Sequence, residues 1–369
     1  MMDWSIVGAT LAHNRKICLQ SKYCFLLVLK MILASFFLVG LKKMNQSSQP
    51  MDTAKEAVNE AAAAAAEPSA EPYTEPSKGF PEVPKDSPAI VLRSVINEGG
   101  LSVVHSGLYG EKKVAVKCPK ADDPKGRCIK QMKVEMDILR LLNEKPHPNV
   151  IEPIACVGER LVLPLFACDL FEYMSKTGVL TEQRGKAFFR QMAEALLHCH
   201  RLGVAHGDVK LENFAIDKYP HGRTIPVIIL IDFGGAATSA RTTADMCMSP
   251  QYAAPEVRAL WRTGTKLSIE NQCSADVWAL GVVLFCLLHK FVPYSMKRPL
   301  TKLQSGDFGS EERWNVSKSA SHLLRQMMAG EPSRRIGMKD ILRHGWLRSR
   351  AHTWVEWGSE QLSSYLFAM

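Results

Sequence analysis

Residues 206–213 read HGDVKLEN, a short segment that carries a carboxylate, an ammonium group and a side-chain amide within six positions. Asp208 could take the proton of a hydroxyl nucleophile, because a general base acts from within hydrogen-bond reach. Lys210 would bring positive charge to a negatively charged reacting group, and Asn213 offers an oxygen of the kind that binds Mg²⁺. The segment therefore predicts a loop that transfers a phosphoryl group to a hydroxyl, with Asp208 and Lys210 as catalytic residues.

A second candidate metal ligand follows downstream. Residues 229–231 read ILI, which predicts a strand, and DFG follows at residues 232–234. Asp232 would thus stand at the end of a strand, where its carboxylate could bind a Mg²⁺ that bridges phosphate oxygens. Asn213 and Asp232 together form the predicted Mg²⁺ site.

A lysine and a glutamate upstream predict the part of the site that holds the phosphates. Residues 114–117 read VAVK, and their alternation predicts a strand that aims Lys117 into a cleft. Glu135 follows 18 residues later on a predicted helix. Such a pair can clamp the α- and β-phosphates of ATP, because the glutamate holds the lysine in place.

The hydrophobic pattern divides the chain around these motifs into a small sheet and a helical body. Short β-branched runs predict antiparallel strands at 89–95, 101–106 and 113–118. Helical spacing of apolar residues predicts a helix over 130–142, and the chain is mainly helical after Pro164. Residues 278–288 are apolar nearly all round, which predicts a buried helix. The expected fold is α+β and two-lobed: a small antiparallel sheet with one helix, a larger and mainly helical second lobe, and the site in the cleft between them.

Composition narrows the class of protein. The 369 residues are 46% hydrophobic and 22% charged, which is typical of a globular chain. Ten cysteines occur singly, without a C-x-x-C pair, and predict neither a disulfide framework nor a structural metal. The net charge is +9, but no basic run of five or more residues occurs, so we expect no nucleic-acid partner. A reducing, cytoplasmic location fits these features best.

The chain ends carry separate segments. Residues 44–88 are acidic and rich in alanine and proline, which predicts a disordered linker. Residues 1–43 are basic and hydrophobic, and the apolar stretch 23–41 is interrupted by Lys30. Three interpretations of this segment stay open: a membrane or organelle-targeting segment, an interfacial patch that associates with a membrane, or an extension upstream of the true start. The aromatic-rich tail, 349–369, would either pack on the second lobe or dock as a partner-binding or autoinhibitory segment.

The order and spacing of the motifs resemble those of eukaryotic protein kinases from about Ala89 to Arg348. The resemblance also rests on APE at 254–256, DVWALG at 276–281 and Arg335. It implies the two-lobed kinase fold for residues 89–348, ATP and Mg²⁺ as cofactors, protein substrates and a monomeric catalytic domain. Lys210 and Ser249 imply the serine/threonine type, and residues 168–173 resemble the calcium/calmodulin-dependent and energy-sensing group.

The resemblance assigns roles to further residues. It adds Lys117 and Glu135 to the catalytic set. The nucleotide-binding positions it implies are Ile96, Asn97, Gly99, Gly100, Ser102, Val104, Ala115, Lys117, Leu163 and Leu165. The structural roles it implies are a Glu256–Arg335 pair, a catalytic loop held by Asp276, and a stack of Leu139, His206 and Phe233. Asp169 and Glu212 match residues that contact arginines before the phosphorylation site, while Cys286 replaces a third acidic contact.

Two motifs depart from the family pattern. The phosphate-covering loop reads NEGGLSVV at 97–104 and keeps only the middle glycine of G-x-G-x-x-G, which predicts weaker ATP binding. Gly207 replaces the arginine that usually binds a phosphate on the activation segment. Phosphorylation of that segment is therefore not expected to be required, although it contains Thr238, Ser239, Thr242 and Thr243.

Two other functions remain to be weighed. A pseudokinase scaffold with weak ATP binding would explain the altered phosphate loop, but it has no chemical need for the full set of Lys117, Glu135, Asp208, Lys210, Asn213 and Asp232. A small-molecule kinase of related fold usually lacks an Ala-Pro-Glu peptide platform, which this chain has.

Overall fold

The computed structural model describes residues 88–121, 126–218, 224–240, 249–264, 266–289 and 316–348. The predicted segment 1–43, nearly all of the predicted linker and the tail 349–369 lie outside these ranges. The described residues all belong to one compact unit that spans Tyr73–Met369.

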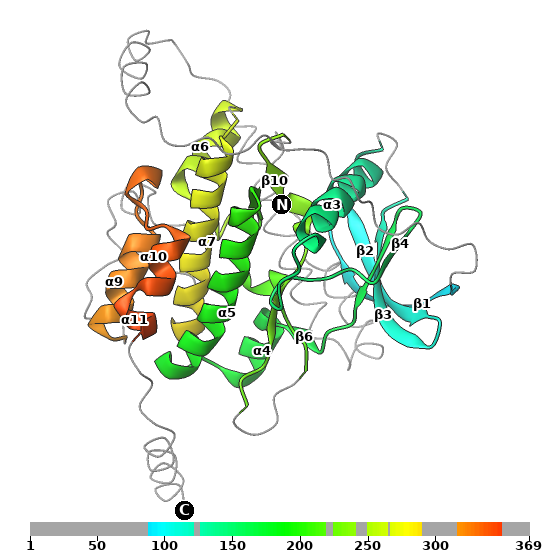
Figure 1. The fold of residues 1–369 in the computed structure, drawn as a ribbon, viewed down its shortest axis with the longest axis horizontal. Helices are drawn as coiled ribbons and strands as arrows, with labels where there is room; N and C mark the ends of the chain where they lie inside the picture. Colours follow the sequence, from blue (N-terminus) through cyan, green and yellow to red (C-terminus); the bar gives the residue numbers. More distant parts are fainter. Residues whose placement is uncertain are drawn as a thin grey trace, which may run out of the picture. The chain divides into compact units, whose positions relative to one another are not determined.

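The first lobe is a five-stranded antiparallel sheet with one helix (Figure 1). Its strands lie in the order β1-β2-β3-β5-β4, with the bounds β1 Ile90–Glu98, β2 Ser102–Tyr109, β3 Lys112–Pro119, β4 Ala155–Val157 and β5 Arg160–Pro164. The three predicted strands match β1 to β3, which run up to three residues further at their ends. The short β4 and β5 were not predicted, because a three-residue and a five-residue run carry too little periodicity.

The helix of this lobe, α3 (Arg127–Asn143), begins after Gly126 and ends near Glu144. Its buried face includes Met132, Met136 and Leu139, which lie at the helical spacing seen in the sequence. Glu135 is also buried on this helix, and only 3% of it is exposed. A buried carboxylate is costly without a partner, so the helix must meet a cation here.

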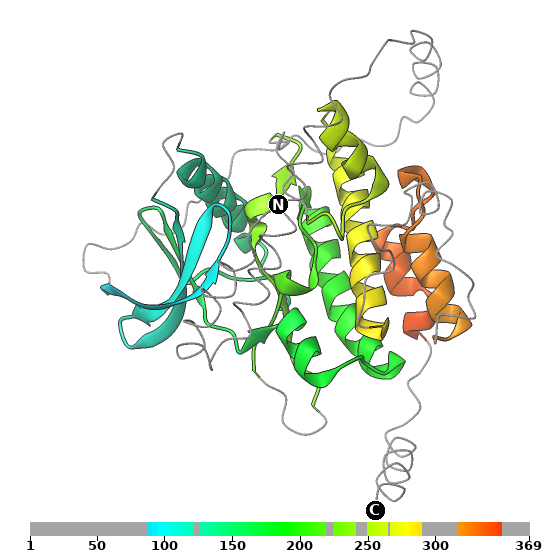
Figure 2. The same cartoon turned by 180° about the vertical axis from the view of Figure 1, so that it is seen from behind.

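The second lobe is built around two long helices that lie side by side in both views, α5 (Glu182–Arg201) and α7 (Ile269–His289) (Figures 1 and 2). Every residue from Ala275 to Leu288 is buried, which confirms the predicted core helix. Smaller helices surround the pair: α4 Leu170–Thr177, α6 Pro255–Thr263, α9 Lys318–Met327, α10 Met338–Arg343 and α11 Gly345–Arg348. Among the described residues, α7 is the one helix long and apolar enough to cross a membrane, but its most apolar window is 83% buried inside the protein.

Short strands carry the predicted motif loops. Strands β6 (Cys168–Asp169), β8 (Phe214–Ile216) and β9 (Ile228–Leu230) form one small sheet, and β7 (Val204–Ala205) pairs with β10 (Ala237–Thr238). The segment HGDVKLEN runs from the end of β7 to the start of β8 and includes the short helix η2 (Leu211–Asn213). Phe233 and Gly234 of the DFG segment belong to the short helix η3 (Phe233–Gly235), which Asp232 caps, and two residues separate β9 from η3. A small sheet lobe and a larger helical lobe thus confirm the expected fold class.

Candidate active site

Three charged side chains from three elements meet at Lys117. The ammonium group of Lys117 on β3 lies 2.6 Å from Glu135 Oε2 on α3 and 2.7 Å from Asp232 Oδ1, next to η3. It also donates a 2.7 Å hydrogen bond to Glu135 Oε1. Lys117 and Glu135 are buried, whereas the Asp232 side chain is 45% exposed. The cluster therefore presents one carboxylate to solvent.

The charges of this cluster do not cancel. Burial alone would lower the pKa of Lys117, but the charges of Asp232 and Glu135 outweigh it and raise that pKa above its ordinary value. The charge of Lys117 lowers the pKa of Asp232 well below its usual range. Burial raises the pKa of Glu135, partly offset by Lys117. When both carboxylates are ionised, two negative charges share one positive charge, which leaves attraction for a further cation.

The catalytic loop gathers its polar groups around Asp208. The Lys210 ammonium group donates to Asp208 Oδ2 and lies 3.3 Å from Ser249 Oγ. The backbone N–H of Ser249 donates to Asp208 Oδ1 at 3.0 Å. The Asn213 amide donates to the Asp208 carbonyl at 2.8 Å. Asp208 is thereby joined to the segment before APE as well as to its own loop.

A buried aspartate on α7 anchors the backbone of the catalytic loop. Asp276 accepts hydrogen bonds from the backbone N–H groups of His206, at 2.7 Å, and Gly207, at 2.9 Å. His200 Nε2 lies 3.0 Å from the same carboxylate. Asp276 is fully buried, so breaking these contacts would leave polar groups without partners. The role that the family resemblance implies for Asp276 agrees with these contacts.

The catalytic loop and the DFG turn also touch through aromatic rings. The rings of His206 and Phe233 meet edge to face with centroids 4.9 Å apart, and His206 Nε2 lies 3.0 Å from the Ile231 carbonyl oxygen. Phe233 and Leu139 belong to the same buried core cluster. In the second lobe, Arg335 Nη1 pairs with Glu256 Oε1 at 2.7 Å, as the resemblance implies.

The predicted nucleotide positions line the first three strands and the end of β5. Strand register sets Val104 opposite Lys117, and Ala115 opposite Leu163. Ile96 and Leu165 are among the exposed large apolar side chains, with 49% and 39% exposed. The remaining predicted positions lie in or beside the β1–β2 turn: Asn97, Gly99, Gly100 and Ser102. In this turn the N–H of Gly99 donates to the Ser102 carbonyl at 2.9 Å.

The residues present fit Mg²⁺ bound together with a nucleotide. The amide nitrogen of Asn213 is engaged with Asp208, which leaves its amide oxygen for a metal, and Asp232 offers a partly exposed carboxylate. In the part of the chain that the structure describes, no three histidine, cysteine, aspartate or glutamate residues are grouped to hold a metal. Two protein ligands, completed by phosphate and water oxygens, are the arrangement that Mg²⁺ usually takes with nucleotides.

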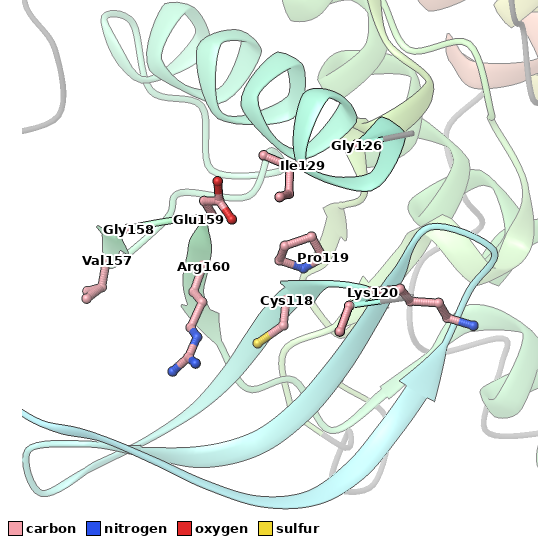
Figure 3. Close-up of a pocket in the computed structure, with 10 residues that line it drawn as sticks. Cys118, Pro119, Lys120, Gly126, Ile129, Val157, Gly158, Glu159 and Arg160 are labelled. Atoms are coloured by element: carbon pink, nitrogen blue, oxygen red, sulfur yellow. The ribbon is translucent and has the colours of Figure 1, made fainter. Parts of the chain in front are cut away.

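A cavity of about 540 Å³ lies outside this site, between the start of α3, the end of β3 and the β4–β5 turn (Figure 3). Its lining includes Cys118, Pro119, Ile129, Val157 and Arg160, and none of the predicted site residues. None of the three residues of the catalytic cluster, Lys117, Glu135 and Asp232, lines the cavity, which is therefore separate from it.

Three contacts of the site were not predicted from the sequence. Asp232 is a partner of Lys117, although the motifs assigned it to the metal alone. The Gln131 side chain on α3 donates to the Gly234 carbonyl. Gln131 lies one helical turn before Glu135, so the sequence could have placed it on the face of α3 that meets the site. Arg258 on α6 donates to the carbonyls of Pro250, at 2.7 Å, and Ala253, at 3.0 Å, and so supports the segment before APE.

Comparison with known proteins agrees with this geometry. A family model described as "Protein kinase domain" matches residues 91–347, so the chain belongs to the protein kinase family. Its relatives include maternal embryonic leucine zipper kinase of Danio rerio, which is 32% identical over an alignment of 296 residues that covers 75% of this chain and 41% of the relative. Serine/threonine-protein kinase GIN4 of Saccharomyces cerevisiae is 34% identical over an alignment of 228 residues that covers 58% of this chain and 18% of the relative.

The chain spans less than half the length of these relatives. They belong to the calcium/calmodulin-dependent kinase group, which confirms the group resemblance taken from residues 168–173.

Proposed function

We propose that this chain is a protein kinase that uses Mg²⁺ and ATP to phosphorylate serine and threonine hydroxyls of protein substrates. The observation that carries the proposal is the shared contact of Asp208 with Lys210 and Ser249. Ser249 belongs to the segment that precedes APE, so the general base stands where a peptide platform meets the catalytic loop. The name of one relative, serine/threonine-protein kinase GIN4, supports the same reaction class.

Each residue of the site has a task in this reaction. ATP would supply the phosphoryl group, and Mg²⁺ would neutralise the charge of its phosphates. Lys117 would hold the α- and β-phosphates, and Asp232 and Asn213 would bind the metal. Asp208 accepts the proton of the substrate hydroxyl as the oxygen attacks, and Lys210 stabilises the charge that develops beside it.

The alternative functions fit the site less well. A pseudokinase has no need for a charged cluster at Lys117 together with a complete set of groups around Asp208. A small-molecule kinase has no need for the support that Arg258 gives to the carbonyls of the platform. Protein phosphorylation uses both features.

The proposal is tested by Asp208→Asn. We expect turnover to fall at least about a hundredfold, because the general base is lost, while stabilisation by Mg²⁺ and ATP in a melting experiment remains. Asp217→Asn, an exposed aspartate just after β8, is the matched control and should keep wild-type turnover. Wild-type protein without Mg²⁺-dependent transfer, or equal turnover in Asp208→Asn, would contradict the proposal.

We also propose that arginine three residues before the acceptor is favoured, through Asp169. Its carboxylate caps α4 by accepting the N–H of Glu172 at 2.7 Å, and burial raises its pKa, with the charge of Glu212 adding to the effect. A cation that binds here would relieve the unfavourable burial of negative charge.

Glu212 supports this acidic subsite. Glu212 Oε2 is buried and has no hydrogen-bond partner among the described residues. Burial and the charge of Glu212 raise the pKa of Cys286 to about 12, so this thiol stays neutral and adds no second charge. We therefore expect arginine two residues before the acceptor to help less than arginine at the third.

The substrate proposal is tested with two peptides that differ only in arginine or alanine three residues before the serine. We expect kcat/KM to be roughly tenfold higher for the arginine peptide, because the contact is charge-assisted but partly exposed. Asp169→Asn should remove most of this difference. A ratio near one in the wild type, or a ratio that survives in the variant, would exclude Asp169 as the contact.

We place the catalytic domain, as a monomer, in the cytoplasm, where ATP is available and thiols stay reduced. The seven described cysteines are all free thiols, which suits a reducing compartment. Membrane association through residues 23–41, which lie outside the described ranges, is tested by fractionation of the full chain against a chain that begins at Met44. Equal soluble fractions would exclude it.

A further inference from the structure

Gly207 occupies a position where the catalytic loop almost touches the DFG turn. Its backbone is left-handed, with φ of 76°. A Cβ atom at this residue would lie 2.1 Å from the carbonyl oxygen of Gly235 and 3.0 Å from its carbonyl carbon. Both atoms belong to the backbone, so no side-chain rotation could relieve the overlap, and one of the two segments would have to move.

The catalytic loop is not free to retreat from this contact. The N–H of Gly207 donates to Asp276 at 2.9 Å, and the N–H of His206 donates to the same buried carboxylate at 2.7 Å. If the catalytic loop moved away from Gly235, it would either press against α7 or break these hydrogen bonds to Asp276.

The opposing turn links Gly235 to the Mg²⁺ ligand Asp232. Gly235 ends η3, and the turn is closed by the N–H of Ala236, which donates to the Phe233 carbonyl at 3.0 Å. Asp232 caps the start of the same turn by accepting the N–H of Gly234 at 3.3 Å. A displacement of Gly235 would therefore pass to Asp232, whose carboxylate bonds to Lys117 at 2.7 Å.

The two glycines of this contact differ in the space they leave for a side chain. A Cβ atom at Gly235 would meet Asp208 Cβ at 3.4 Å and its other neighbours at 3.5 Å, which are ordinary distances. An added methyl group is thus compatible with position 235 and incompatible with position 207. The absence of a side chain at Gly207 is what allows the two segments to lie this close.

We propose that Gly207 is a positioning residue that sets the distance between the general base Asp208 and the Mg²⁺ ligand Asp232. This inference rests on the proposed kinase function and adds a role for the residue that departs from the family pattern. It follows that restoring the family's arginine, as in Gly207→Arg, disables this chain.

Gly203 offers a matched control for the backbone conformation. It is also left-handed, with φ of 69°, and a Cβ atom there would meet nothing within 4 Å. Asparagine tolerates this conformation better than most residues, so it adds a Cβ atom with little backbone strain. The pair Gly207→Asn and Gly203→Asn therefore isolates the effect of the contact with Gly235.

We expect Gly207→Asn to lose at least tenfold in kcat and to need several-fold more Mg²⁺ for half-maximal turnover, because Asp232 is displaced. Gly203→Asn should stay within threefold of the wild type on both measures. Circular dichroism and melting curves should show both asparagine variants folded at the assay temperature. Gly207→Arg should be at least as impaired as Gly207→Asn.

Other outcomes would overturn the inference. Gly207→Asn within threefold of the wild type would show that the contact does not position Asp232. An equal loss in Gly203→Asn would show that the backbone conformation alone matters. If neither Gly207→Asn nor Gly207→Ala folds while Gly203→Asn does, the glycine serves folding and not positioning.

A failure of the proposed function is distinguishable from a failure of this inference. Wild-type protein that transfers no phosphoryl group would remove the kinase proposal. The inference would then be judged by the rise in melting temperature on adding Mg²⁺ and ATP. A smaller rise in Gly207→Asn than in Gly203→Asn would support it, and equal rises would overturn it.

Discussion

The phosphate-covering loop and the catalytic loop both depart from the family pattern at glycine positions, but in opposite senses. The phosphate loop has lost glycines, and a Cβ atom at either Gly99 or Gly100 would meet nothing closer than 3.7 Å. The catalytic loop has gained Gly207, where a Cβ atom would lie 2.1 Å from a backbone oxygen. The same residue type is thus dispensable to the protein's own packing in one loop and required in the other.

The two loops also differ in how firmly the contacts around them hold them in place. The phosphate loop is braced by an ion pair between Lys120 and Glu98 in which the side chains are 30% and 61% exposed, and such pairs stabilise little. The catalytic loop is held by Asp276, which is fully buried and accepts two backbone hydrogen bonds. We therefore expect changes in the catalytic loop to be severe and changes in the phosphate loop to be graded.

Among changes to the supports of the two loops, the largest effect is expected from Asp276→Asn. The amide has one acceptor oxygen and turns a donor toward a backbone N–H, so at least one buried donor loses its partner. This should cost about 2–3 kcal/mol of unfolding free energy and lower kcat at least about tenfold. Denaturant unfolding and kcat measurements test this, with Asp217→Asn as the exposed control. Unchanged stability and turnover would show that the catalytic loop does not depend on its buried anchor.

A smaller effect is expected when the missing glycines are restored by Asn97→Gly with Ser102→Gly. The backbone can then approach the phosphates more closely, so KM for ATP should fall about threefold while kcat stays near the wild-type value. Gly100→Ala should change KM less, because the added methyl group meets nothing within 4 Å. An increase in KM in the double variant would mean that Asn97 or Ser102 itself binds the nucleotide.

The smallest effect is expected from alanine at Thr238, Ser239, Thr242 and Thr243 together. Without an arginine at position 207 to bind a phosphate, the variant and phosphatase-treated protein should both keep most of the wild-type turnover. Thr238 is also buried in β10, with 4% exposed, so it is a poor acceptor; Thr242 and Thr243 lie outside the described residues. A tenfold loss, about 1.4 kcal/mol in barrier terms, would show that another basic residue reads a phosphate. Arg241, also outside the described residues, is then the first candidate.

The sequence predicted features that depend on local pattern. The buried helix around Trp278 followed from its apolar run, and Lys117 and Glu135 followed from a strand and a helix at a known spacing. The start of α7 at Ile269 was not predicted, because the first turns of the helix are polar and do not continue the apolar run. Patterns of this kind define the middle of an element better than its ends.

Contacts between distant segments were predicted less well. From the sequence, Gly207 was identified as a departure from the kinase family pattern and was interpreted as the loss of a phosphate-binding side chain. Its approach to Gly235 depends on how two loops 28 residues apart are brought together, which no local pattern encodes. The bond between Lys117 and Asp232 was missed for the same reason, since 115 residues separate the two.

The apolar surface of α7 has a consequence for the order in which the chain folds during synthesis. This helix ends at His289, but it packs against α9 (Lys318–Met327), which is made later. Trp346, later still, meets Phe189 of α5 edge to face with ring centroids 5.9 Å apart. A ribosome must therefore release roughly 60 residues beyond α7 before the second lobe can close, and at about 5–20 residues per second this takes several seconds. During that interval α7, which is as apolar as a membrane span, lacks part of the packing that buries it in the folded protein.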